Sequence, residues 1–158
     1  CATTGAVDKK PDYLRALVSA LDIDAREFTP ILGGDYELTA RPGWMAGAPD
    51  HFSVSALHQD QVADPPEDAT VLARSEHCAY AALTYGDPEA PYAISLQPHP
   101  EFDAAFLDEL LALRGGTTFP VEMANAARAS LTRPTQRLDW ARWIAGYLRQ
   151  AGAARAAA

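Results

Sequence analysis

The residues of this sequence best suited to chemistry are a histidine and a glutamate two positions apart, in the segment Leu96-Gln97-Pro98-His99-Pro100-Glu101. If that segment is extended, side chains two positions apart point to the same side of the backbone, so the His99 imidazole and the Glu101 carboxylate lie together. A carboxylate beside an imidazole fixes its tautomer and raises its basicity, as in the base and orienting residue of a nucleophilic triad. A histidine in an ordinary turn at a strand end is the alternative interpretation of the same spacing.

A second polar segment, His58-Gln59-Asp60-Gln61, follows a stretch in which apolar and polar residues alternate. This alternation is typical of a strand, and open α/β sheets bind their ligands at strand ends. His58 and Gln59 are therefore candidate pocket residues. The alternative is a solvated loop.

A base of this kind would serve a sulfur nucleophile, and the chain holds two cysteines, Cys1 and Cys78. Cys78 directly follows His77, so on a strand the two side chains would face opposite ways, and we expect Cys78 to be a buried structural residue. Cys1 would act as a nucleophile only through its free α-amine as base. No Cys-x-x-Cys or His-x-x-x-His spacing occurs, so we predict no metal site, and nothing in the sequence indicates a cofactor.

Short alternating segments and periodic apolar segments predict an α/β domain that would present these side chains. Its 158 residues, 48% hydrophobic, suffice for one core, and the net charge of −8 disfavours nucleic acid as a partner. No apolar run reaches the length of a membrane span, and two cysteines make no disulfide framework, so we expect a cytoplasmic protein without a membrane partner. The predicted strands are residues 36–39, 52–57, 70–73, 80–85 and 92–97, and the predicted helices are residues 12–21, 102–113, 121–129 and 138–148.

The ordered set of motifs resembles one family. A strand, His58-Gln59-Asp60-Gln61-Val62, a proline-rich loop, Val71-Leu72-Ala73-Arg74-Ser75, Cys78, another strand and Gln97-Pro98-His99-Pro100-Glu101-Phe102 follow one another. In this order they resemble the C-terminal half of a class I glutamine amidotransferase domain of the stand-alone, GMP-synthase-like type. The resemblance covers roughly residues 33–150.

The resemblance implies a flavodoxin-like fold with C-terminal helices and a glutaminase activity. Such domains hydrolyse the side-chain amide of glutamine through a Cys-His-Glu triad and pass the ammonia to an acceptor or a partner synthetase. By resemblance His99 is the general base, Glu101 orients it, and His58 and Gln59 lie beside the bound glutamine. A related hydrolase of γ-glutamyl amides would use the same triad, and a catalytically inactive relative would keep the fold to bind a partner.

The sequence departs from the family where the nucleophile is expected. The family places its cysteine in a Gly-x-Cys-x-Gly-His-Gln turn between a strand and a helix, and no such segment occurs here. We interpret residues 1–31 as an N-terminal strand-end, helix and strand piece, residues 32–150 as the C-terminal half of the domain, and residues 151–158 as a frayed alanine-rich tail. On this interpretation the fold is incomplete, and the missing middle would carry the nucleophile.

Overall fold

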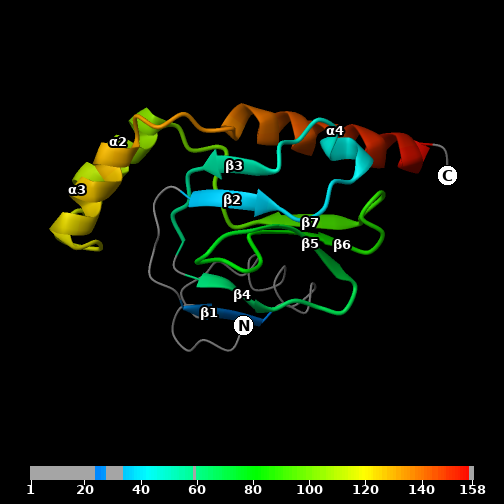
Figure 1. The fold of residues 1–158 in the computed structure, drawn as a ribbon, viewed down its shortest axis with the longest axis horizontal. Coiled ribbons are helices and arrows are strands. Elements are labelled where there is room, and N and C mark those ends of the chain that lie inside the picture. The colour runs from blue at the N-terminus through cyan, green and yellow to red at the C-terminus, as the bar shows by residue number, and fades with distance from the viewer. Residues whose placement is uncertain (1–23, 28–33, 59, 157–158) are drawn as a thin grey trace.

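The computed structural model describes residues 24–27, 34–58 and 60–156, with the side chains at 24–27, 60 and 155 left aside. Within these ranges the chain is an α/β structure, as the sequence predicts (Figure 1). Cys1, Gln59 and the helix expected at residues 12–21 lie outside the described residues.

Five strands form an antiparallel sheet in the order β3-β2-β5-β6-β7. In the pairing of β2 with β3, Tyr36 lies opposite Phe52 and the two rings stack with centroids 5.3 Å apart. The five segments that alternate in the sequence all become strands. The bounds are β2 Gly34–Leu38, β3 His51–Val54, β5 Ala69–Arg74, β6 Ala82–Tyr85 and β7 Ala93–Leu96.

A separate two-stranded ribbon pairs β1 (Asp24–Glu27) with β4 (Asp60–Asp64) in antiparallel register. The sequence pattern does not predict β4, because four of its five residues are polar or small and do not alternate with apolar ones. Val62 of β4 is buried and belongs to the cluster that contains Leu83 and Tyr85 of β6. The ribbon therefore contributes to the core on the β6 face of the sheet.

Three helices follow the last strand, and a 3₁₀ helix, Gly43–Met45, lies between β2 and β3. The helices are α2 Ala104–Arg114, α3 Val121–Ser130 and α4 Arg137–Ala156. Figure 1 shows α2 and α3 side by side beyond one end of the sheet, with α4 running along the side where β3 lies. α4 continues to Ala156, so the expected frayed tail is wrong for residues 151–156, where alanine favours continuation of the helix.

The core on the α4 side of the sheet is aromatic. Trp140 of α4 is fully buried and meets the Phe52 ring edge-on at 5.3 Å, while Trp143 packs against Trp140 at 5.2 Å. Tyr147 completes the stripe by contacting Trp44 of the 3₁₀ helix at 5.7 Å. The aromatic residues of α4 are therefore core residues rather than an exposed patch.

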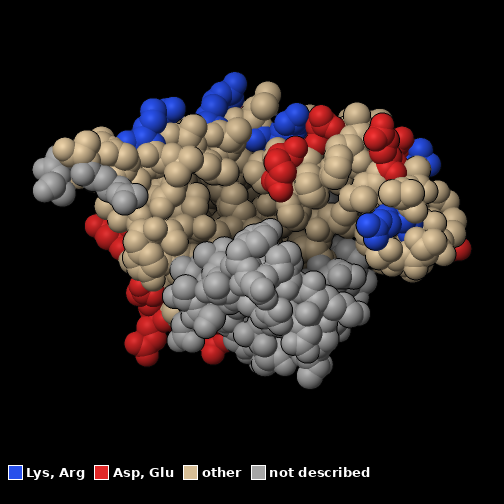
Figure 2. Space-filling model, turned by 180° about the vertical axis from the view of Figure 1, so that it is seen from behind, with Lys and Arg blue, Asp and Glu red and all other residues tan. Residues whose placement is uncertain are grey.

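Positive side chains on the face shown in Figure 2 follow the edge of the molecule that α4 occupies. Several of the arginines in and before α4 have acidic partners: Arg142 pairs with Asp139 at 2.5 Å, and Arg137 lies 4.0 Å from Asp103. The edge therefore carries less unbalanced positive charge than its arginine content suggests. No helix in the described ranges has the length and apolarity that a membrane span needs.

Candidate functional site

His99 lies in the connection that leaves β7 and enters α2. The Gln97 N–H donates to the Ala81 carbonyl at 2.8 Å, which extends the pairing beyond β7, and the His99 N–H donates to the Ser55 carbonyl at 2.7 Å. The chain then turns, because the Phe102 N–H donates back to the His99 carbonyl at 3.1 Å. Prolines on both sides of His99 restrict this backbone further. The imidazole thus projects from a segment held by hydrogen bonds to two different parts of the sheet.

The structure brings the His99 imidazole and the Glu101 carboxylate together. Nδ1 of His99 lies 2.7 Å from Oε1 of Glu101, a hydrogen bond that leaves Nε2 at the opposite side of the ring. The His99 side chain is 30% exposed and that of Glu101 62%. The sequence predicts that the two side chains lie close together, and they do. The backbone is not extended between them, however: a turn over residues 99–102 brings the side chains together.

The ring of Phe102 covers one face of the imidazole, and the ring of Phe106 packs on Phe102 in turn. The Phe102 ring stacks on the His99 ring with centroids 4.4 Å apart and planes 9° from parallel, and Phe106 packs on Phe102 at 4.8 Å. Asp103 fixes the start of α2 between these two phenylalanines, because its carboxylate accepts the Phe106 N–H at 2.9 Å. The ring that contacts His99 is therefore supported by the first turn of α2.

His58 is the second predicted site residue that the structure places near His99. It follows β3, its side chain is partly buried, and burial together with the nearby His99 lowers the pKa of its imidazole. A lowered pKa favours the neutral ring, which can both donate and accept a hydrogen bond. His58 thus lies within electrostatic range of His99. Gln59 lies outside the described residues.

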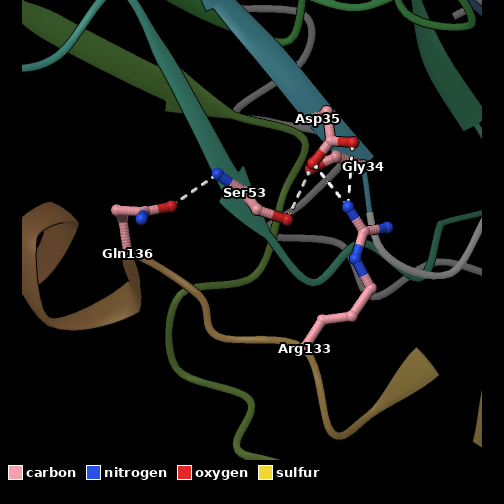
Figure 3. A network of polar contacts seen from close by, with 5 residues as sticks. All are labelled: Gly34, Asp35, Ser53, Arg133 and Gln136. Atoms are coloured by element: carbon pink, nitrogen blue, oxygen red, sulfur yellow. Dashed lines mark hydrogen bonds and ion pairs between the residues drawn. The ribbon is translucent and has the colours of Figure 1, made fainter.

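The outer edge of β3 holds the site to the rest of the fold, a role that no pattern in the sequence predicts. Gln136 takes both backbone groups of Ser53: its N–H donates to the Ser53 carbonyl at 2.8 Å, and its side-chain oxygen accepts the Ser53 N–H at 2.6 Å (Figure 3). Residues two apart in a strand direct their backbone groups to the same edge, so Ser55 presents its carbonyl to His99 on this edge too. Gln136 and His99 therefore occupy neighbouring places along one strand edge.

A salt bridge lies next to this connection. Arg133 donates to both carboxylate oxygens of Asp35 in β2, at 3.1 and 3.0 Å (Figure 3). These hydrogen bonds hold the pKa of the Asp35 carboxyl below its usual value. The hydroxyl of Ser53 also donates to the Gly34 carbonyl at 3.4 Å. The segment before α4 is thus attached to both β2 and β3.

Cys78 is a structural residue, as the sequence predicts. It is 3% exposed within the core cluster that contains Trp140, and burial raises the pKa of its thiol. Its N–H donates to the Ser75 hydroxyl at 3.1 Å and its carbonyl accepts the Ser75 N–H at 2.8 Å, so the loop is closed on itself. The neighbouring His77 is exposed and lies 3.9 Å from Glu76. A buried, protonated thiol is a poor nucleophile, so Cys78 is not suited to that role.

No group of three or more histidine, cysteine, aspartate or glutamate side chains within the described ranges is placed to share a metal ion. The hydrogen-bonded pair of His99 and Glu101 has the groups that proton transfer needs, and His58 lies close enough to interact electrostatically with His99.

Comparison with curated proteins finds relatives named as γ-glutamyl peptidases. No protein-family model matches the sequence. It is similar to γ-glutamyl peptidase 3 of Arabidopsis thaliana, with 28% identity over 103 residues, and to γ-glutamyl peptidase 5 of the same plant, with 29% over 93 residues. The alignments cover 64% and 58% of this chain but 40% and 34% of the two peptidases. The chain thus spans less than half the length of the curated relatives it matches.

Solved structures with the same architecture include glutamine amidotransferases. A glutamine amidotransferase from Thermotoga maritima superposes with a TM-score of 0.57 at 19% identity, over 87% of this chain and 58% of that one. A glutamine amidotransferase from Methylobacillus flagellatus gives a TM-score of 0.56 at 23% identity, over 82% of this chain and 58% of that one. The chain has the class I glutamine amidotransferase fold, as the ordered motifs predict.

Proposed function

We propose that this chain belongs to an amide hydrolase that cleaves the side-chain amide of glutamine, with His99 as the general base and Glu101 as the residue that orients it. The observation that carries the proposal is the 2.7 Å contact between Nδ1 of His99 and the Glu101 carboxylate, in a fold that glutamine amidotransferases share. A carboxylate on Nδ1 keeps the proton there, which leaves the lone pair of Nε2 available to take a proton from a nucleophile.

The reaction that this pair supports proceeds by acyl transfer to sulfur. Nε2 of His99 accepts the proton of a cysteine thiol, and the thiolate adds to the amide carbon of the substrate. The tetrahedral intermediate collapses to a thioester when His99 returns the proton to the departing ammonia. Water, deprotonated by His99, then hydrolyses the thioester to glutamate and frees the thiol. Backbone N–H groups would stabilise the oxyanion at both additions.

The thiol that this reaction needs must come from a cysteine other than Cys78. Because Cys78 is buried in the core, the nucleophile is either Cys1 or a cysteine in a strand-to-helix turn that this sequence does not contain. A glutamine analogue with an electrophile in place of its side-chain amide distinguishes these sources. Labelling of Cys1, abolished in Cys1→Ser, would identify it as the nucleophile. An unlabelled chain would show that neither cysteine of this sequence is the nucleophile, and it would count in favour of the non-catalytic alternative given below.

Two alternatives have specific support. The similarity to γ-glutamyl peptidases favours a hydrolase that acts on γ-glutamyl amides of peptides, which are the same chemical bond with a larger leaving group. The burial of Cys78 and the missing nucleophile turn favour a non-catalytic relative that binds a small amide or a partner protein. If ammonia is released, an acceptor substrate or a partner synthetase would consume it.

The deciding experiment measures release of ammonia from glutamine, and of the leaving amine from γ-glutamyl peptides, by the full chain and by His99→Asn. We expect the substitution to lower the rate by about 100-fold or more, the usual loss when a general base is removed. His77→Asn is the matched control, because His77 also lies near a glutamate but is exposed. Measurable turnover at equal rates in wild type and His99→Asn would contradict the proposal. Glutamine binding near His99 without turnover would favour the non-catalytic alternative.

A further inference from the structure

The ring of Phe102 is stacked on the imidazole of His99. The two rings are nearly parallel, with 9° between their planes and 4.4 Å between their centroids. The Phe102 N–H also donates to the His99 carbonyl, so backbone and side chain both tie the two residues together. Phe106 packs on Phe102 from the next turn of the same chain segment, at 4.8 Å. The position of Phe102 is therefore restricted by its backbone, by α2 and by a second ring.

A hydrogen bond to Glu101 alone does not fix the imidazole, because Glu101 is largely exposed and its carboxylate can rotate with the ring. A flat partner on the ring face removes this freedom, since rotation about the bond between Cβ and the ring would tilt the imidazole into the phenyl ring. The phenyl face is also the negative pole of its quadrupole, which attracts the imidazolium formed when His99 accepts a proton. The groups that face His99 are thus Glu101 at Nδ1, Phe102 on the ring face, and His58 nearby.

We propose that Phe102 is a positioning residue for His99: its stacked ring holds the imidazole plane in the orientation in which Nδ1 faces Glu101 and Nε2 faces away from it. The inference rests on the proposed function, because it assigns Phe102 a part in presenting Nε2 to the nucleophile. α2 supplies the rigid support, since Asp103 caps its first turn and holds Phe106 against Phe102. Phe102 acts through its contact with His99.

The test reads the tautomer of His99 directly, by nitrogen-15 NMR of the full chain with labelled histidine, at a pH where the ring is neutral. In the wild type we expect the Nδ1–H tautomer and ring-current displacement of the His99 carbon-bound protons. Phe102→Leu keeps an apolar side chain of moderate size but removes the ring. It is expected to abolish the displacement and to shift the tautomer ratio toward Nε2–H by about 2- to 10-fold, the range for loss of a stacked ring pair. Phe102→Tyr retains the ring and should restore the wild-type ratio.

Two further variants separate this inference from the proposed function. Leu113→Ala changes an exposed residue near the far end of α2 and should leave the His99 signals unchanged. Glu101→Ala removes the acceptor at Nδ1 and should abolish the Nδ1–H preference. An unchanged tautomer ratio in Phe102→Leu, with the preference lost in Glu101→Ala, would overturn the role of Phe102 and leave the proposed function standing. An unchanged ratio in Glu101→Ala would show that the pair itself is not the orienting device, which contradicts the proposed function. If Phe102→Leu does not fold, Phe106→Leu, which loosens the Phe102 ring, must shift the ratio in the same direction.

Discussion

Gln136 bonds to both backbone groups of Ser53, so that one residue just before α4 replaces a neighbouring strand at the edge of β3. The same strand edge continues to Ser55, whose carbonyl accepts the His99 N–H. The candidate base and the start of α4 are therefore attached to one strand edge at positions two residues apart. A substitution that breaks these contacts at the β3 edge should therefore lower the free energy of unfolding and also disturb the position of His99.

Gln136→Ala should destabilise the fold. The substitution leaves the Ser53 N–H without its acceptor at 2.6 Å in a partly buried place, which costs about 1–3 kcal/mol in the free energy of unfolding. Urea unfolding followed by tryptophan fluorescence measures the change. Gln150→Ala is the control, because Gln150 donates to a carbonyl at an exposed site and its loss should cost about 0.5 kcal/mol or less. A loss in Gln136→Ala no larger than in Gln150→Ala would show that the β3 edge does not depend on this residue.

His58 should make the stability of the protein sensitive to mild acid. Burial and His99 lower the pKa of folded His58 below its usual 6.5, so between the lowered value and 6.5 the unfolded chain binds more protons than the folded one. The contribution of the neutral ring is thus complete above 6.5 and is lost as the pH falls through that value toward the folded pKa.

The comparison of His58→Gln with the wild type tests this sign. We expect the free energy of unfolding to decline less steeply in the variant when the pH is lowered below about 6.5. His77→Gln, at an exposed histidine, should retain the wild-type slope. A variant slope equal to or steeper than that of the wild type would contradict the placement of His58 in a partly buried position.

Cys78 should be unreactive in the folded protein. The residue is 3% exposed and burial raises the pKa of its thiol, so little thiolate is available to an alkylating reagent. Mass spectrometry after treatment with iodoacetamide should find the peptide containing Cys78 unmodified under native conditions and fully modified in denaturant. Rapid native labelling of Cys78 would mean that its loop opens readily, and Cys78 would then have to be reconsidered as a nucleophile.

The sequence predicts the strands of the main sheet and the last three helices well, because alternation and helical spacing report directly which residues face a core. The strand β4 cannot be predicted in this way, because Val62 is its one buried apolar residue and the strand is defined by its backbone pairing with β1. The buried face of α2 is not evident from the sequence either. Phe106 and Leu113 are seven positions apart and so lie on one face of the helix, yet they are 47% and 73% exposed, while Leu107 and Leu111 are buried. Leucines occur on both faces of α2, so periodicity cannot tell which face meets the core.

The candidate site is predictable only where its residues are close in the sequence. His99 and Glu101 are two positions apart, so a turn or a strand brings them together in either case. The attachment of His99 to Ser55, and of Ser53 to Gln136, joins segments far apart in the chain. Apart from the side-chain oxygen of Gln136, the groups that bond are backbone groups, which the type of side chain does not reveal. The spacing of residues in the sequence therefore predicts the pair of His99 and Glu101. The hydrogen bonds that fix the position of His99 in the fold come from distant parts of the chain and are not predicted.

Substitutions of Trp140 test how much the aromatic core between α4 and the sheet contributes to stability. Its side chain is fully buried and its ring meets Phe52 edge-on, yet its Nε1–H has no hydrogen-bond partner among the described residues. Trp140→Phe keeps a ring against Phe52 and removes the unsatisfied donor, so the two effects oppose each other and we expect a loss of about 1.5 kcal/mol or less. Trp140→Ala leaves a large cavity and should cost about 3–5 kcal/mol.

The two substitutions at Trp140, measured by urea unfolding followed by circular dichroism, separate packing from hydrogen bonding. A loss in Trp140→Phe close to that in Trp140→Ala would mean that the indole N–H is bonded in the folded protein, through a water molecule or a neighbouring group. Similar small losses in both variants would show instead that α4 contributes little to the core. In that case the Gln136 contact, which positions the start of α4 on β3, would lose its structural support as well.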